Sequence, residues 1–94
     1  MYFIVFAKDV AGGLPIRRAN RDAHLAWLKA DPEVTVHVAG PLLSDDAQMM
    51  GSTLIVEAMS KSAITQWLLS DPYAKAGLTA SVEVHGYNWA VGAP

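Results

Sequence analysis

Three side chains that can bind anions or move protons recur at helical spacing near the start of the chain: Arg17, Arg21 and His24. Residues at i, i+4 and i+7 lie along one side of an α-helix, so these three would form a single stripe. Histidine exchanges protons near neutral pH, and arginine binds carboxylates or phosphates through paired hydrogen bonds. The stripe therefore indicates either an anion-binding acid–base site or the solvated face of a surface helix, and spacing alone favours the solvated face.

A possible partner for the histidine is Asp71, which stands directly before Pro72 in the segment SDPYAKAGL. An aspartate followed by proline is a frequent start of a short helix, and N-capping is the simpler explanation of this residue. A carboxylate has two oxygens, however, so one can accept backbone N–H groups while the other accepts an imidazole N–H. Capping and pairing with His24 are therefore compatible.

The remaining histidines, His37 and His85, fall in expected strands and have no carboxylates at metal-ligand spacing. The chain also has no cysteine, so the sequence predicts no metal site. Glycine-rich phosphate-binding patterns in the required strand–helix context are absent as well. We therefore expect no cofactor, and we expect both histidines to pack on strand faces.

Hydrophobic patterning predicts the elements that must position these residues. The expected strands are Tyr2–Lys8, Glu33–Leu43, Ser52–Met59 and Thr79–Trp89, and the expected helices are Ile16–Ala30, Lys61–Leu69 and a single turn at Pro72–Ala76. Gly40-Pro41 is expected to break the second strand, and Ser60 to cap the second long helix. The face of the first helix that is expected to meet the core consists of Ala19, Ala23, Ala26, Trp27 and Ala30.

The element order β-α-β-β-α-β is typical of the ferredoxin-like α+β fold, a four-stranded antiparallel sheet with two helices on one face. The opposite face would carry Phe3 or Ile4, His37, Ile55 and Tyr87, and no element of the chain would cover it. A second copy stacked sheet to sheet would bury this surface, so we expect a homodimer.

Composition narrows the class of protein further. The chain has 94 residues, of which 52% are hydrophobic and 17% charged, as expected for a single domain spanning residues 1–94. A net charge of −2, with no stacking aromatic residues on the third expected strand, argues against nucleic-acid binding. The N-terminal apolar run is too short for a signal peptide, and no run is long enough to span a membrane. We therefore expect a cytoplasmic protein without a membrane partner.

Four sequence blocks together resemble the YciI-like (YCII-related) family: RRANRDAHLAWL, VAGPLL, GSTLIVEA and SDPYAKAGLTASVEV. The resemblance covers nearly the whole chain, and the blocks occur in the family's order. It implies a dimeric α+β barrel built from ferredoxin-like subunits, with a catalytic histidine–aspartate pair, His24 and Asp71, in a cleft. It also implies that Arg17, Arg21, Gly40, Pro41 and Ser52 lie near that cleft and bind the substrate.

These observations predict a cofactor-independent enzyme that moves a proton on a small anionic or cyclic organic molecule, by lyase, isomerase or hydrolase chemistry. The alternative is a non-catalytic dimeric module that binds a small ligand or has a regulatory role. A third hypothesis, an oxygenase of the same barrel type, has no identifiable haem-ligand motif to support it.

Overall fold

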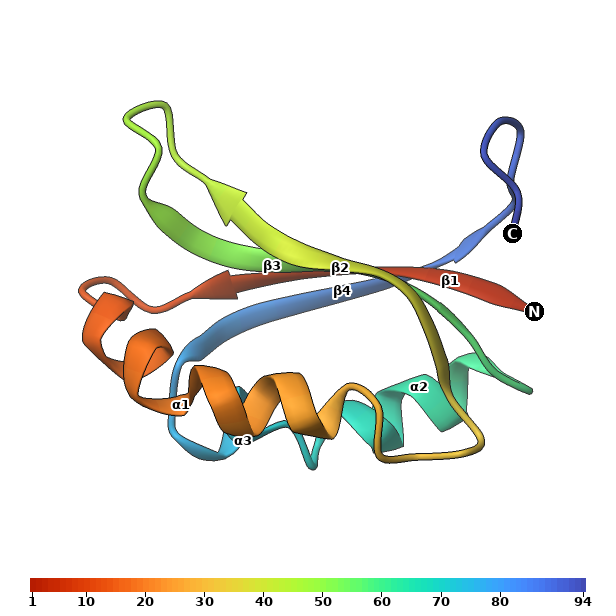
Figure 1. Ribbon diagram of the computed structural model, residues 1–94, viewed down its shortest axis with the longest axis horizontal. Helices are drawn as coiled ribbons and strands as arrows, with labels where there is room; N and C mark the ends of the chain where they lie inside the picture. The colour runs from red at the N-terminus through yellow and green to blue at the C-terminus, as the bar shows by residue number, and fades with distance from the viewer.

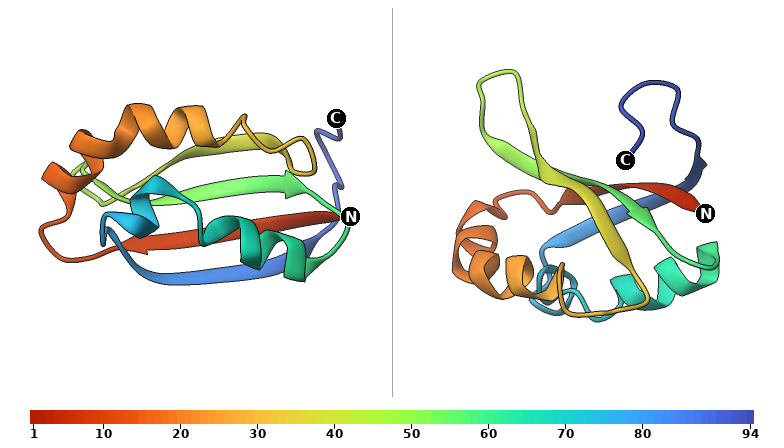
Figure 2. Two further views of the ribbon diagram at one scale, coloured as in Figure 1. Left: turned by 90° about the horizontal axis from the view of Figure 1, so that it is seen from below. Right: turned by 45° about the vertical axis from the view of Figure 1, so that its right-hand side comes forward.

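The computed structural model describes all 94 residues, and its elements alternate in the predicted order (Figure 1). They are β1 (Tyr2–Asp9), α1 (Leu14–Trp27), β2 (Thr35–Leu43), β3 (Met49–Glu57), α2 (Lys61–Leu68), α3 (Pro72–Lys75) and β4 (Thr79–Tyr87). The strands pair antiparallel in the order β2-β3-β1-β4. All helices lie on one face of this sheet, as two views show (Figures 1 and 2). The predicted ferredoxin-like α+β fold is confirmed.

The core lies between the sheet and α2. Phe3 and Val5 of β1 point toward the helices, and Ile64 and Trp67 of α2 pack against them. Burying each side chain of this size contributes roughly 1.5–3 kcal/mol. Trp67 also stacks on Trp27 of α1, with ring centroids 4.1 Å apart and planes inclined by 16°. This stack holds the C-terminal end of α1 beside α2.

The buried face of α1 differs from the prediction. The alanines expected to face the core, Ala19, Ala23, Ala26 and Ala30, are exposed, and Trp27 is only half-buried. Arg17, His24 and the following Leu28 are buried instead. Helical periodicity treats arginine and histidine as outward-facing, but a buried polar side chain is stable when a partner elsewhere in the fold satisfies it. The helix also begins and ends earlier than expected, at Leu14 and Trp27.

The second strand begins later than expected, at Thr35, but it is continuous where a break was expected, and the third strand begins earlier than expected. Gly40-Pro41 does not break β2, which runs to Leu43, and Pro41 lies opposite Ser52 of β3. Because β2 is an edge strand, a proline there need not donate to a second neighbour. β3 begins at Met49 instead of Ser52, because the hairpin between the strands closes through a short turn at residues 44–48.

The expected N-terminal caps of α2 and α3 are confirmed. The hydroxyl of Ser60 accepts a hydrogen bond from the backbone N–H of Ala63. Asp71 caps α3 by accepting from the N–H of Tyr73. Gly77 follows α3 with φ of +79°, a left-handed conformation that glycine adopts without strain. No helix of the structure is long and apolar enough to cross a bilayer.

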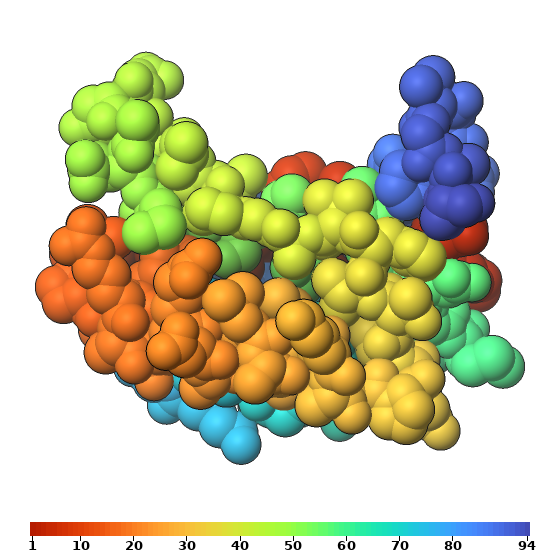
Figure 3. All heavy atoms as spheres, viewed as in Figure 1, coloured from red at the N-terminus to blue at the C-terminus, as the bar shows by residue number.

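The open face of the sheet is largely apolar. Ile4 and Ile55 lie opposite one another across β1 and β3, and Val38 lies beside them on β2. Of the two residues predicted for β1, Ile4 lies on this face and Phe3 lies in the core. The β2–β3 hairpin and the C-terminal residues 88–94 rise on either side, which gives this side of the molecule a saddle shape (Figure 3).

Candidate functional site

A cavity of about 110 Å³ lies between α1 and the two neighbouring strands β2 and β3. Its lining comprises Arg17, Arg21, His24, Leu25, Leu28, Ala39, Gly40, Pro41, Ser52, Leu54 and Tyr73. Every residue predicted to belong to the site is in this lining except Asp71. Asp71 instead borders a void of about 20 Å³ that His24 also borders. The residues that the sequence singled out from four separate segments are therefore brought together.

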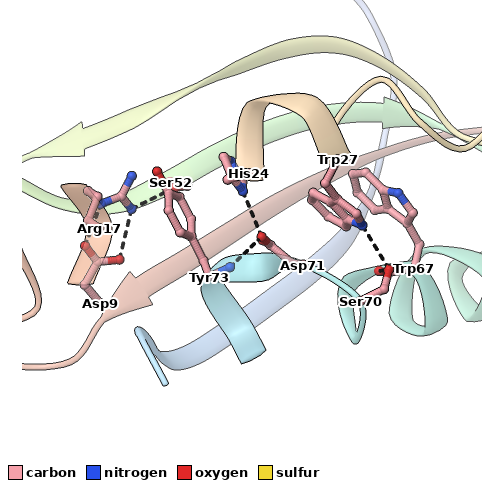
Figure 4. Close-up of polar contacts among 9 residues, drawn as sticks. All are labelled: Asp9, Arg17, His24, Trp27, Ser52, Trp67, Ser70, Asp71 and Tyr73. Atoms are coloured by element: carbon pink, nitrogen blue, oxygen red, sulfur yellow. Dashed lines mark hydrogen bonds and ion pairs between the residues drawn. The ribbon is translucent and has the colours of Figure 1, made fainter. Parts of the chain in front are cut away.

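His24 and Asp71 form a hydrogen-bonded pair across 47 positions of sequence (Figure 4). Nδ1 of His24 lies 2.8 Å from Oδ1 of Asp71, and the side chains are only 8% and 13% exposed. The same oxygen accepts the backbone N–H of Tyr73 at 2.9 Å. We expected each oxygen to serve one donor, but Oδ1 serves both, because the first turn of α3 and the His24 ring approach the carboxylate from the same side.

The packing around α1 explains why Asp71 reaches His24. The indole N–H of Trp27 donates to the hydroxyl of Ser70 at 2.9 Å, directly before Asp71 in the chain. That hydroxyl donates in turn to the carbonyl of Trp67, at 2.8 Å. The link between α2 and α3 is therefore tied to the last turn of α1, where His24 lies. The pair forms because this tertiary packing places the α3 cap beside the helix.

The pairing fixes which ring nitrogen is free. A carboxylate can only accept, so the nitrogen that faces Asp71, Nδ1, carries the proton when the ring is neutral. Nε2 then has a lone pair, and it has no hydrogen-bond partner within the protein. His24 also lines the cavity between α1 and the strands. The arrangement leaves a proton acceptor unpaired on a residue that lines this cavity.

Tyr73 holds the plane of the histidine ring. Its phenol ring stacks on the imidazole with centroids 3.9 Å apart and planes inclined by 12°. The guanidinium carbon of Arg17 lies 4.8 Å from the centroid of the same phenol ring. Burial raises the pKa of Tyr73 above its ordinary value, although Arg17 and Arg21 oppose the shift and Asp71 adds to it. The phenol is therefore a neutral wall of the cavity at physiological pH.

Arg17 is largely committed to the protein itself. Its Nε and Nη2 donate to the two carboxylate oxygens of Asp9 at 2.8 and 2.9 Å, and Nη2 also donates to the hydroxyl of Ser52 at 2.8 Å. The Arg17 and Asp9 side chains are 4% and 7% exposed. Burial alone would lower the pKa of Arg17, but the hydrogen bonds and charge of Asp9 outweigh it and raise that pKa. Only Nη1 is free to donate to a ligand.

Arg21 lines the same cavity as Arg17 but differs from it in exposure and in pairing. It is exposed, it lines the cavity, and it forms no ion pair within the protein. The basic stripe predicted from the sequence is thus split into a buried structural arginine and an unpaired one. The interpretation as a solvated helix face is wrong for Arg17 and His24, which are buried.

Two residues of the site were not predicted as such. Asp9 lies at the end of β1, and only the turn into α1 brings it to Arg17; the single hint was an acid eight positions upstream. Tyr73 was part of the quoted Asp-Pro-Tyr block, but nothing in its spacing indicated that it stacks on His24. No group of three or more histidine, cysteine, aspartate or glutamate side chains is placed to hold a metal ion.

The other histidines lie on the opposite face of the sheet or at its margin. His37 contacts Glu57 through Nε2 at 3.0 Å and packs beside Tyr2. His85 lies 3.4 Å from Glu83, and both side chains are exposed. Neither pair has an arginine as a hydrogen-bonded or stacked neighbour. The prediction that these two histidines pack on strand faces agrees with this placement.

Solved structures with a similar fold include an enzyme. The 5-chloro-2-hydroxyhydroquinone dehydrochlorinase TftG of Burkholderia phenoliruptrix, in complex with 2,5-dihydroxybenzoquinone, is 38% identical and superposes with a TM-score of 0.79, over 94% of each chain. Rv0793 of Mycobacterium tuberculosis is 15% identical, with a TM-score of 0.58 over 97% of each chain, and supports the fold alone.

Sequence comparisons agree with the structural ones. Protein YciI of Escherichia coli is 36% identical over 91 residues, which are 89% of this chain and 93% of that protein. An uncharacterised protein of Haemophilus influenzae is 35% identical over the same lengths. The model of the YCII-related domain matches residues 1–88. The chain therefore belongs to the YCII-related domain family.

Proposed function

We propose that this protein is a cofactor-independent enzyme in which His24, oriented by Asp71, transfers a proton on a compact anionic or cyclic organic substrate. Residues 1–94 would act as one YciI-like domain. The observation that carries the proposal is the buried His24–Asp71 hydrogen bond, which leaves Nε2 unpaired in a residue that lines the cavity. A positioned proton-transfer group of this kind is typically worth about 10²–10⁴-fold in rate.

The proton moves from the substrate to Nε2 of His24. The donor is an acidic ring hydroxyl or a C–H next to a carbonyl, and its bonding electrons stay on the substrate as an oxyanion or enolate. The imidazolium that forms keeps its Nδ1–H on Asp71, whose negative charge stabilises the new positive charge. Tyr73, stacked on the ring, keeps Nε2 aimed in a single direction.

The negative charge on the substrate would be balanced by the two arginines. Arg21 is exposed and unpaired, and it supplies a complete guanidinium. Arg17 supplies only its free Nη1, but Asp9 and Ser52 hold it rigidly, so this donor needs little reorganisation. Gly40 and Pro41, which carry no polar side chain, would form the wall against the flat side of the substrate.

The volume of the cavity and the similarity to TftG both favour a substrate with a single ring. The cavity of about 110 Å³ is well below the ~300–1,000 Å³ of pockets for drug-sized ligands. TftG, which is 38% identical, is a dehydrochlorinase seen with a dihydroxybenzoquinone. Among the open reaction types this favours elimination: after His24 takes the proton, the electron pair left on the substrate forms a new double bond to the carbon that carries the leaving group, and the leaving group departs with the electrons of its own bond.

The test is turnover by the purified protein of a chlorinated hydroxyhydroquinone and of a panel of hydroxylated ring compounds, followed as chloride release and as absorbance of the quinone product. We expect turnover that His24→Asn removes and that His85→Asn, a change at an exposed histidine outside the cavity, leaves intact. Binding of quinones by the wild-type protein without any turnover would favour the non-catalytic binding module instead.

We also propose that a second copy of the chain covers the open sheet face. Ile4 and Ile55 are only half-buried there, and Phe6 and Val38 are exposed. The hairpin and the C-terminal residues on either side of this face would contact the partner at the rim of the saddle (Figure 3). An interface of standard size buries about 800 Å² on each partner. Light scattering at micromolar concentration tests this; a monomer there would contradict it.

A further inference from the structure

A second and larger cavity adjoins the one that contains His24. Its volume is about 540 Å³, several times that of the first. It lies between the C-terminal half of α1, the loop that follows and the first half of β2. Its lining comprises Leu25, Leu28, Lys29, Asp31, Pro32, Val34, Thr35, Val36, His37 and Ala39.

The two cavities are adjacent to one another. Leu25, Leu28 and Ala39 line both of them, and no other residue does. The end at His24 is cationic and polar. At the larger end, here called the apolar groove, half of the lining residues are aliphatic, and the others are polar, charged or proline. The segments that border this groove, the end of α1 and the approach to β2, lie next to one another on the front of the molecule (Figure 3).

The fold leaves this groove open for identifiable reasons. β2 is the edge strand of the sheet, so it has a neighbour on one side only. α1 ends at Trp27, and β2 begins only at Thr35, so no helix runs along the first residues of this strand. Leu25 is 39% exposed although it is a large aliphatic residue. Grouped rather than scattered apolar side chains of this kind mark binding surfaces.

We propose that the apolar groove binds an alkyl or similarly apolar substituent of the substrate whose ring occupies the His24 cavity. The inference rests on the proposed function and names the substrate class: a hydroxylated or carboxylated ring bearing an apolar chain of several carbons. The adjacency of the two cavities supports it, because Leu25, Leu28 and Ala39 border both, so a substituent on a ring in the first cavity would lie next to the groove. The difference in lining also supports the proposal. Cationic side chains border the His24 cavity and aliphatic ones border much of the groove, which suits an amphipathic ligand.

The experiment compares ligands that differ only in the substituent. We would titrate the protein calorimetrically with 2,5-dihydroxybenzoquinone, the compound seen with TftG, and with its methyl, propyl and hexyl derivatives. Burial of each added methylene in the groove should tighten binding about threefold to fourfold until the groove is filled. Flat affinity across the series in the wild-type protein would overturn the proposal.

Two variants locate the effect. Val36→Phe fills the groove away from the His24 cavity, so it should abolish the gain from the hexyl chain and leave the affinity for the parent quinone within about twofold. Leu25→Ala, at an exposed and therefore tolerant position, should reduce the hexyl-to-parent affinity ratio at least fivefold. Leu69→Ala, an exposed leucine that lines neither cavity, is the matched control and should leave the ratio unchanged.

The outcomes separate this inference from the proposed function. If the parent quinone does not bind, the quinone version of the proposed function fails, while a hexyl derivative that binds wild type more tightly than Val36→Phe still supports the groove. If the parent quinone binds, and the hexyl derivative binds wild type and Val36→Phe equally, the proposal that the groove holds the substituent is wrong and the proposed function stands. A change in oligomeric state of Val36→Phe, with flat affinity across the series, would assign the groove to a segment of a second copy.

Discussion

On each side of the sheet a histidine is hydrogen-bonded to a carboxylate. The two pairs have similar distances but differ in burial and in the ring nitrogen that the carboxylate contacts. On the helix-covered face His24 lies 2.8 Å from Asp71, and on the open face His37 lies 3.0 Å from Glu57. The first pair is 8% and 13% exposed, whereas the second is 20% and 44% exposed. A partly exposed pair such as the second contributes little to the stability of the fold, because water competes for both partners.

The two pairs also differ in the ring nitrogen that is hydrogen-bonded to the carboxylate. Asp71 binds Nδ1 of His24 and leaves Nε2 free, in a residue that lines the small cavity together with Arg17 and Arg21. Glu57 binds Nε2 of His37, whose ring neighbours are the aromatic side chains of Tyr2 and Trp89. A hydrogen-bond length therefore does not identify a catalytic pair. The proposal that His24 and Asp71 are catalytic rests instead on their burial, on the free nitrogen and on the nearby positive charge.

The largest expected effect is on turnover. His24→Asn should lower the rate of product formation by about 10²–10⁴-fold, because it removes the proton acceptor. His85→Asn, at an exposed histidine of the open face that lines neither cavity, should change that rate less than about threefold. Steady-state kinetics on the substrate found by the screen measures both. Equal losses in the two variants would break the contrast between the faces.

The next effect is on stability, and it concerns the two arginines of α1. Arg17→Ala leaves the carboxylate of Asp9 buried without its partner, which typically costs about 3–5 kcal/mol in the free energy of unfolding. Arg21→Ala, at an exposed and unpaired position, should cost no more than about 0.5 kcal/mol. Urea unfolding gives both values. A small loss for Arg17→Ala would show that Asp9 does not need this partner.

On the open face the expected effect is on assembly. Ile55→Asp places a charge in the proposed dimer interface and should raise the dimer dissociation constant about thirtyfold or more, as loss of a central interface residue does. Leu69→Asp is the matched control, since Leu69 is an exposed aliphatic residue of the segment after α2 on the helix side. Sedimentation of both variants should find only Ile55→Asp dissociated. Dissociation of both, or of neither, would contradict the assignment of the interface.

The smallest expected effect is on the ionisation of Tyr73, which stacks on His24 on the helix-covered side of the sheet. Burial raises the pKa of Tyr73, so its phenol should ionise above the ordinary tyrosine pKa of about 10. A raised pKa means that the folded state holds this proton more tightly than the unfolded state, so its stabilising contribution is complete below about pH 10 and is lost as the pH rises through the raised pKa. The difference in tyrosinate absorbance between wild type and Tyr73→Phe gives the midpoint. A midpoint below 10 would mean that Arg17 and Arg21 dominate.

The order of the elements along the chain and the antiparallel sheet were predictable, because alternation within a strand and helical spacing within a helix are local patterns, and the order β-α-β-β-α-β is typical of this fold. The caps at Ser60 and Asp71 were predictable from local chemistry alone. In these cases the determining residues are neighbours in the chain.

The buried face of α1 was not predictable from periodicity. Arg17 and His24 are buried only because Asp9 and Asp71 meet them, and Asp71 is 47 positions away from His24. The alanines assigned to the core are small enough to be exposed at little cost. The pairing of His24 with Asp71 was raised by local chemistry and by the family resemblance, whereas Asp9 and the stacking of Tyr73 required the tertiary structure.

The central claim is that Asp71 holds His24 with its proton on Nδ1 and its lone pair on Nε2, facing the substrate. Nitrogen-15 NMR of the imidazole rings at mildly alkaline pH, with and without 2,5-dihydroxybenzoquinone, tests it most directly in wild type and Asp71→Asn. The account predicts the Nδ1–H tautomer for His24 in wild type, a ligand-induced shift at its Nε2, and a mixture of tautomers in Asp71→Asn. An Nε2–H tautomer in wild type, or a ligand response at His37 and none at His24, would contradict it.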